Sequence, residues 1–261
     1  MSDGEKDVAS CAPALEARGL TLAWEAGHEV VRGVTLHVGR DEVVCLVGRS
    51  GCGKTTILPA LAGLPSPAEG RVLLHGRDVT GRPGSVSYML QKDLLLPSLR
   101  IVDNVCLPLV IAGTPRAEAR RTAEPLFERF GLSGCEGKWP SELSGGMRQR
   151  AAFLRTYLMG RDVTLLDEPF SALDALTRVE IRRWFCQMAH ELGLSALVIT
   201  HDVDEAVSMA SRIYVLAGSP SAGEPSHVAG EVRVAHVAGE TDFELTDRFL
   251  DAKRQVMSLL G

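Results

Sequence analysis

The sequence predicts an α/β fold with a mostly parallel sheet, an antiparallel β region and an inserted α-helical region. From residue 163 to 217, apolar strand-like runs alternate with helix-like segments, a pattern typical of parallel strands joined by helical crossovers. Residues 16–24 and 29–38 alternate apolar and polar side chains, as half-buried antiparallel strands do. Between residues 101 and 159 the apolar period becomes helical, which places the helical region inside the sheet-forming sequence.

The elements follow in order along the chain. Residues 42–48 form a nearly continuous apolar run, which predicts a strand buried on both faces. The helix expected after Lys54 contains Pro59, which removes one backbone hydrogen bond and should bend it. The other predicted elements are strands 71–76, 85–90, 163–168, 196–201 and 212–217, helices 175–193 and 202–210, and an amphipathic helix near the C-terminus.

These elements predict a division into domains. We expect residues 1–13 to be disordered and residues 14–230 to form one domain, with a helical subdomain at about 92–159. The Gly-, Ser- and Pro-rich residues 218–230 are predicted to form a loop. Residues 231–261 are expected to form a tail that ends in the terminal helix.

Composition excludes several classes of function. The 261 residues carry a formal net charge of −5, so a polyanion-binding surface has no support from the overall charge. No apolar run is long enough to cross a bilayer, and the acidic start does not resemble a secretory signal. The six cysteines show neither paired nor zinc-type spacing, which predicts reduced thiols in a cytosolic protein.

The segment GRSGCGKTT, residues 48–56, predicts a P-loop that binds nucleotide phosphates. Its glycines let backbone N–H groups turn inward, Lys54 can reach the outer phosphates, and the Thr55 hydroxyl can bind Mg²⁺. A glycine-rich turn with a chance lysine is the alternative, but the preceding strand and following helix favour the P-loop. The candidate nucleotide-binding residues here are Gly48, Arg49, Ser50, Gly51, Cys52, Gly53, Lys54, Thr55 and Thr56.

A pair of carboxylates ends the predicted strand 163–168. Successive strand residues face opposite ways, so Asp167 and Glu168 can have different targets. We expect Asp167 to hold Mg²⁺ through water and Glu168 to polarise the attacking water. Two surface acids at a strand end are the alternative, which the P-loop in the same chain makes less favourable.

A second glycine pair, in SELSGGMRQR at residues 141–150, remains to be explained. The part LSGGMRQR resembles the signature motif of ATP-binding cassette proteins. Other marks of that family stand around it in order: an aromatic residue at 24, the P-loop, Gln91, LLDEP, SALD at 171–174 and ITHD with His201. The resemblance covers about residues 15–217.

The resemblance implies that two such domains meet head to tail with ATP between the P-loop of one and the signature of the other. Ser144, Gly145 and Gly146 would then face the γ-phosphate held by the opposite chain. The alternative is that Ser144 simply caps the helix that follows it. This role is compatible with the local sequence, but it does not explain the glycine pair. With one copy of each motif, the chain needs a second copy of itself or a paralogue.

The remaining roles are also what the resemblance implies. Trp24 would stack on adenine, Gln91 would contact Mg²⁺ or the attacking water, and His201 would hydrogen-bond the γ-phosphate. Asp174 would contact the opposite subunit. The alternatives are a core aromatic for Trp24, a loop amide for Gln91 and a helix N-terminal acid for Asp174.

The stretch from QKDLLLP to LPL, residues 91–109, together with DEPFSALDALTR, is similar to importers of the nitrate, sulfonate, taurine and thiamine-precursor type. This implies an ATPase subunit at the cytoplasmic face of a membrane, bound to permease subunits and indirectly served by a solute-binding protein. The leucines at 94–96 are either an apolar docking surface or core. A soluble cassette ATPase acting on nucleic acid or ribosomes and a P-loop kinase are the alternatives. The solute, the identity of the partner cassette and the role of residues 218–245 stay open.

Overall fold

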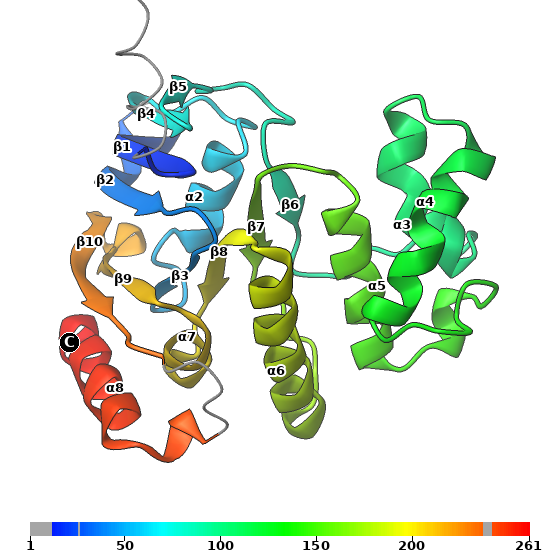
Figure 1. The fold of residues 1–261 in the computed structure, drawn as a ribbon. Coiled ribbons are helices and arrows are strands. Elements are labelled where there is room, and N and C mark those ends of the chain that lie inside the picture. The colour runs from blue at the N-terminus through cyan, green and yellow to red at the C-terminus, as the bar shows by residue number, and fades with distance from the viewer. Residues whose placement is uncertain (1–11, 26, 237–241) are drawn as a thin grey trace, which may run out of the picture.

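The computed structural model describes residues 12–25, 27–236 and 242–261, apart from the side chains of Trp24 and Glu25 (Figure 1). The disorder predicted for residues 1–13 therefore lies almost wholly outside the described residues. Within them, one ten-stranded sheet forms the frame of the molecule. In spatial order its strands are β5 (Arg77–Asp78), β4 (Glu69–Leu74), β1 (Leu15–Glu25), β2 (His28–Val38), β10 (Glu224–Arg233), β9 (Arg212–Ser219), β3 (Val43–Gly48), β8 (Ser195–Thr200), β7 (Val163–Asp167) and β6 (Ser87–Met89).

The sheet has two regions that differ in strand direction. Strands β5, β4, β1 and β2 pair antiparallel, whereas β9, β3, β8, β7 and β6 pair parallel. Strand β10 joins the regions, because it pairs antiparallel with β9 and meets β2 at one parallel pair, Ser226 with Val31. The predicted α/β class, with a mostly parallel core and an antiparallel β region, is confirmed.

Strand β3 shows why the parallel region is apolar on both faces. Val44 and Leu46 belong to the core shared with the antiparallel strands and the helix after the P-loop. Cys45 and Val47 belong to the core on the opposite face. Because side chains alternate along a strand, an uninterrupted apolar run is what a strand between two cores requires.

Several of the helices around this sheet begin at polar capping residues. Asp174, Asp202 and Thr246 each accept a hydrogen bond from a backbone N–H in the first turn of the helix that follows. Pro59 lies in the helix after the P-loop, which ends at Leu61. The helices are α2 (Lys54–Leu61), α3 (Ile101–Ile111), α4 (Arg116–Arg129), α5 (Gly145–Tyr157), α6 (Ala175–Leu192), α7 (Val203–Met209) and α8 (Asp247–Leu260), with short 3₁₀ turns η1 (Pro140–Glu142), η2 (Pro220–Ala222) and η3 (Phe243–Leu245).

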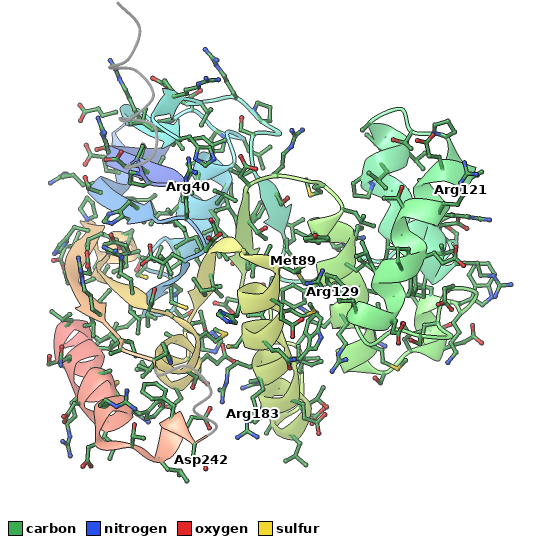
Figure 2. The ribbon with its side chains drawn as sticks, viewed as in Figure 1. Arg40, Met89, Arg121, Arg129, Arg183 and Asp242 are labelled. Carbon is green, nitrogen blue, oxygen red and sulfur yellow. The ribbon has the colours of Figure 1, made fainter. Side chains whose placement is uncertain are left out.

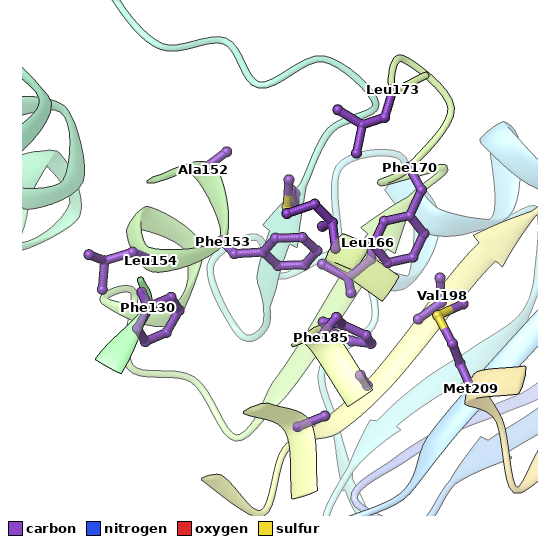
Figure 3. Close-up of a cluster of buried hydrophobic side chains, with 14 of the residues drawn as sticks. Phe130, Ala152, Phe153, Leu154, Leu166, Phe170, Leu173, Phe185, Val198 and Met209 are labelled. Atoms are coloured by element: carbon purple, nitrogen blue, oxygen red, sulfur yellow. The ribbon is translucent and has the colours of Figure 1, made fainter. Parts of the chain in front are cut away.

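The helices α3, α4 and α5 form a separate group beside β6 and fall within the predicted helical subdomain (Figure 1). An aromatic cluster joins this group to the rest of the molecule (Figure 3). Phe153 of α5 stacks on Phe185 of α6 at a centroid distance of 5.2 Å, and Phe170 lies 5.9 Å from Phe185. These rings fix α5 relative to the end of β7, where the predicted carboxylates lie.

The loop predicted for residues 218–230 is wrong. Strand β9 continues to Ser219, and after the turn η2 the chain returns as β10 (Glu224–Arg233). Pairing with β9 supplies the backbone hydrogen bonds that make this polar segment a strand, with register shifts between Glu224 and His227 and between Val228 and Gly230. Composition alone could not indicate that partner, because pairing is a tertiary contact.

The predicted terminal amphipathic helix is present as α8, which packs against α7, β9 and β10 (Figure 1). Phe249, Ala252 and Val256 form its buried face. Lys253 pairs with Asp204 of α7 at 2.6 Å. Among the described helices, none combines the length and the apolar character needed to cross a bilayer.

Candidate nucleotide-binding site

The P-loop connects β3 to α2 and needs glycine at particular positions. Gly53, the residue before α2, has φ +86°, and Gly51 has φ +79°, a backbone conformation that other residues rarely adopt. At Gly48 a Cβ would lie 2.9 Å from the carbonyl oxygen of Leu216 and closer still to Cys52 Sγ. The loop is therefore a concave turn at the carboxyl end of a buried strand, where ligands of such sheets bind.

The Lys54 side chain is held across this turn by the backbone of the loop. Its Nζ donates to the carbonyl oxygens of Gly48 at 2.6 Å and Arg49 at 2.9 Å, and the side chain is 5% exposed. Arg49, Ser50, Gly51 and Thr55 are exposed around it, while Cys52 and Gly53 are buried and Thr56 is half-buried. An ammonium group held over an open loop can donate hydrogen bonds to phosphate oxygens.

Asp167 ends β7 with a buried carboxylate. Its side chain is 7% exposed, and Oδ1 is buried without a hydrogen bond from any described residue. Burial, reinforced by the charge of Glu168, raises the pKa of Asp167 although Lys54 acts in the opposite direction. A buried, unpaired carboxylate oxygen beside the P-loop fits a Mg²⁺ site completed through water, and the exposed Thr55 hydroxyl fits the same site.

Two other predicted catalytic residues, His201 and Gln91, converge on Glu168. His201 Nδ1 lies 3.1 Å from Glu168 Oε2, and Gln91 Nε2 donates to the same oxygen at 3.4 Å. They come from three segments: Gln91 follows β6, Glu168 follows β7 and His201 follows β8. Because these parallel strands end at one edge of the sheet, residues far apart in sequence meet there.

Glu168 itself has an unusual backbone. Its φ is +42°, which costs a non-glycine residue energy and needs support from its surroundings. The support is visible: Glu168 N donates to the carbonyl oxygen of Ile199 at 2.9 Å, and the Ser171 hydroxyl donates to the carbonyl oxygen of Glu168 at 2.9 Å. The strained turn directs the carboxylate toward His201 rather than along the strand.

Ser171 is a site residue to which sequence reasoning gave no role. Its Oγ also accepts a hydrogen bond from Gln91 Nε2 at 3.4 Å, so it links Gln91 to the backbone of Glu168. The available signal was its place at the head of the segment SALD, directly after the carboxylate pair. Asp174, at the end of that segment, accepts from Thr177 N at 3.1 Å, and hydrogen bonding by the Thr177 side chain and backbone lowers the pKa of Asp174.

The signature turn is not brought to the P-loop of its own chain. Ser144 caps α5 by accepting from Met147 N at 3.3 Å, which is the local role that the sequence also allowed. Gly146 is buried against α6, where a Cβ would lie 2.9 Å from Thr177 Cγ2. Figure 1 shows α2 and α5 on opposite sides of β6 and β7. The start of α5, with Ser144 and Gly145, is directed elsewhere than to the phosphates of its own P-loop.

Trp24, predicted to stack on adenine, lies near the end of β1, and its side chain is outside the described part of the chain. Its predicted role therefore stays a prediction.

The leucines after Gln91 divide between two environments. Leu95 is buried, whereas Leu94 and Leu96 are 49% and 44% exposed. Arg155 of α5 donates to the carbonyl oxygens of Asp93 and Leu94, and Arg148 pairs with the Asp93 carboxylate at 3.2 Å. Leu95 is therefore part of the core, whereas Leu94 and Leu96 form exposed surface. A hollow of about 270 Å³ lies beside them, lined by Lys92, Asp93, Leu94, Gly145, Arg148, Gln149, Ala172 and Leu173.

Comparison with known proteins places these features in a family. The family model described as ABC transporter matches residues 31–171. The formylaminopyrimidine import ATP-binding protein ThiZ of Halalkalibacterium halodurans is 39% identical over 204 residues, covering 78% of this chain and 80% of the relative. The aliphatic sulfonates import ATP-binding protein SsuB of Rhodopseudomonas palustris is 41% identical over 205 residues, covering 78% and 70%.

A solved structure has the same fold. It is a dimeric post-hydrolysis state of the ATP-binding cassette MJ0796 bound to ADP and Pi. The TM-score is 0.70 at 25% identity, and the match covers 85% of this chain and 100% of that chain.

Proposed function

The chain belongs to the ABC transporter family, and we propose that it is the ATP-hydrolysing subunit of a solute importer. It binds ATP and hydrolyses it to energise solute import. The observation that carries this function is the division of the site. The P-loop, Asp167 and the Glu168 cluster meet at one edge of the sheet, whereas the signature turn opens away from them.

That division requires two cassettes. In a head-to-tail pair, Ser144, Gly145 and Gly146 of one chain reach the γ-phosphate of ATP held by the P-loop of the other. The free N–H groups at the start of α5 and its helix dipole favour an anion there. The dimeric neighbour bound to ADP and Pi supports this arrangement. A second copy of this chain is the partner cassette we propose.

Within one site each residue has a separate task. Lys54 and the loop amides hold the β- and γ-phosphates, and Trp24 stacks on the adenine. Glu168 accepts a proton from the attacking water, and Gln91 with Ser171 keeps the Glu168 carboxylate in place. His201, 3.1 Å from that carboxylate, can donate to the γ-phosphate. Most of the catalysis is positioning of water and charge rather than covalent chemistry.

Mg²⁺ would be held by the Thr55 hydroxyl, by Asp167 through water and by Gln91. When bound, it would neutralise phosphate charge and favour cleavage of the outer phosphoryl group. The buried, unpartnered Oδ1 of Asp167 supports this assignment.

Hydrolysis is coupled to transport through permease subunits at the cytoplasmic face of the membrane. The exposed Leu94 and Leu96 directly follow the Gln91 segment, so a helix that packs on them would sense the γ-phosphate through Gln91. A solute-binding protein acts on the permease, not on this chain. The relatives named for sulfonates and for a formylaminopyrimidine support an importer of the predicted group. A further relative from Rhizobium meliloti is named for Fe(3+) import, so we leave the solute class open.

The test is co-expression with candidate permease genes. We expect Mg·ATP hydrolysis by the purified chain and recovery of the chain with membranes only when its permease is present. The alternative, a soluble cassette ATPase on nucleic acid or ribosomes, has no counterpart among the named import relatives. ATPase activity stimulated by nucleic acid but not by any permease would overturn the importer function.

A further inference from the structure

A series of contacts runs inside the chain from the signature turn toward His201. At its first end, the Leu173 side chain lies beside the signature glycines, where a Cβ on Gly145 would be 3.4 Å from Leu173 Cδ2. The Leu173 carbonyl oxygen accepts a hydrogen bond from Arg178 Nη2 at 2.9 Å. Arg178 lies one turn into α6, so it fixes the segment 171–174 to the helix that follows it.

At the other end, Arg178 faces a buried carboxylate. Its Nε is 3.8 Å from Glu205 Oε1, and Glu205 of α7 is only 4% exposed. Glu205 Oε2 accepts from the Thr200 hydroxyl at 2.6 Å, and Thr200 Oγ1 accepts from Asp202 N at 3.0 Å. Thr200 and Asp202 flank His201, so Glu205 holds the strand end that carries this residue.

Arg178 and Glu205 form an ion pair without a hydrogen bond between them. Arg178 Nε is buried but has no hydrogen-bond partner among the described residues, and 3.8 Å is beyond hydrogen-bonding distance. Arg182, one turn further along α6, pairs with Glu244 instead. A buried N–H and a buried carboxylate oxygen that face each other without bonding can tighten with a small shift of either element.

We propose that Arg178 is a positioning residue that couples the two ATP sites of a dimer. Through Leu173 it holds the signature turn, which faces the partner's ATP. Through Glu205 and Thr200 it holds the strand end of His201, which faces the chain's own ATP. This role depends on the proposed function, because the first end of the link has a target only in a dimer. Arg178 touches neither nucleotide, so its loss should leave ATP binding to one chain intact.

The test compares Arg178→Gln with Arg183→Gln, each made in the wild-type chain and in a Glu168→Gln background. Arg183 is an exposed arginine on the same helix and is therefore the matched control (Figure 2). For Arg178→Gln we expect the Kd of Mg·ATP for the monomer to stay within about twofold. We expect kcat to fall about tenfold with KM little changed, because one bridging charged group is lost. The ATP concentration that half-saturates dimer formation in the Glu168→Gln background should rise about tenfold, and cooperativity should fall.

Two further variants separate coupling from simple structural support. Arg178→Lys keeps the charge but cannot bridge both partners, so it should show an intermediate kcat. Arg178→Gln and Glu205→Gln should be non-additive in kcat when combined, since both interrupt one link. Arg178→Lys also serves if Arg178→Gln does not fold.

The outcomes distinguish the two proposals. If the Glu168→Gln parent dimerises with ATP and the Arg178 variants dimerise and hydrolyse like Arg183→Gln, the coupling role is wrong and the proposed function stands. A parent that stays monomeric with Mg·ATP overturns both. A loss of monomer ATP affinity equal to the loss of dimerisation also overturns the coupling role.

Discussion

The P-loop and the signature turn are both glycine-containing segments that open a helix, yet they differ in which site residues the described part of the chain brings to them. At the P-loop, Lys54 already bonds two loop carbonyls, and the Glu168 cluster stands at the same sheet edge. At the signature turn, Ser144 is exposed and, among the described residues, bonds only its own helix. The difference supports the proposed dimer, in which the signature turn completes a nucleotide site on another molecule.

The largest expected effect comes from a substitution that blocks ATP hydrolysis and changes only the P-loop side of the site. Glu168→Gln keeps the size of the side chain but removes the carboxylate that accepts the proton, so the ATPase rate should fall by about 10²- to 10⁴-fold. ATP binding should persist, and dimer should accumulate, because the contacts to the γ-phosphate are no longer lost. Phosphate release and sedimentation with Mg·ATP measure the two quantities.

Glu180→Gln, at an exposed position of α6, is the matched control for that substitution. It removes the same charge away from the site and should leave both the rate and the oligomeric state unchanged. Full turnover by the Glu168 variant would remove this residue from the role of base.

The next largest effect is a loss of affinity for the nucleotide rather than of hydrolysis. Lys54→Ala removes the ammonium group that lies across the loop, and charged hydrogen bonds of this kind contribute about 1.5–3 kcal/mol each. We therefore expect the Kd of Mg·ATP to rise by about ten- to a hundredfold at one chain. Titration calorimetry measures it, with Lys138→Ala in the helical region as control. An unchanged Kd would contradict the placement of Lys54 at the phosphates.

A smaller effect is expected from a substitution in the signature turn, which tests the difference between this turn and the P-loop. Ser144→Asp keeps a side chain that can cap α5, so the fold should persist, but it places a negative charge where the partner's γ-phosphate would lie. We expect the affinity of the monomer for ATP to be unchanged and the ATP-driven dimer to be lost. The ATPase rate should fall by up to about tenfold.

Ser144→Asn is the neutral control for that charge, since asparagine also caps helices. It should dimerise far better than the aspartate variant. Equal behaviour of the two variants would show that no phosphate approaches Ser144.

The sequence predicted the parallel core because this core depends on order along the chain, and the resemblance to ATP-binding cassette proteins indicated Gln91 and His201 as site residues along with Glu168. A buried strand, a P-loop and a helix must follow one another, and strands that end in DE and TH must bring these residues to one edge. The same reasoning could not find β10, because its polar sequence becomes a strand only through pairing with β9. Nor could it find the strained φ of Glu168, the support from Ser171 or the buried link from Arg178 to Glu205, which depend on side chains that meet only after folding.

The last expected effect is a change in the alkylation rate of Cys52, which lies inside the P-loop and tests the geometry of the loop in the wild-type chain. Burial raises the pKa of the Cys52 thiol more than the nearby Lys54 lowers it, so the reactive thiolate is scarce at neutral pH. Alkylation by N-ethylmaleimide should be slow and should accelerate as pH rises, by about tenfold for each unit below that pKa. Mg·ATP should protect the thiol, and modification should block nucleotide binding, because Cys52 is 2% exposed and packs under Gly48. Mass spectrometry assigns the modified residue, and Cys52→Ala is the control. Labelling of Cys52 at the same rate with and without Mg·ATP would show that the loop does not close on phosphates.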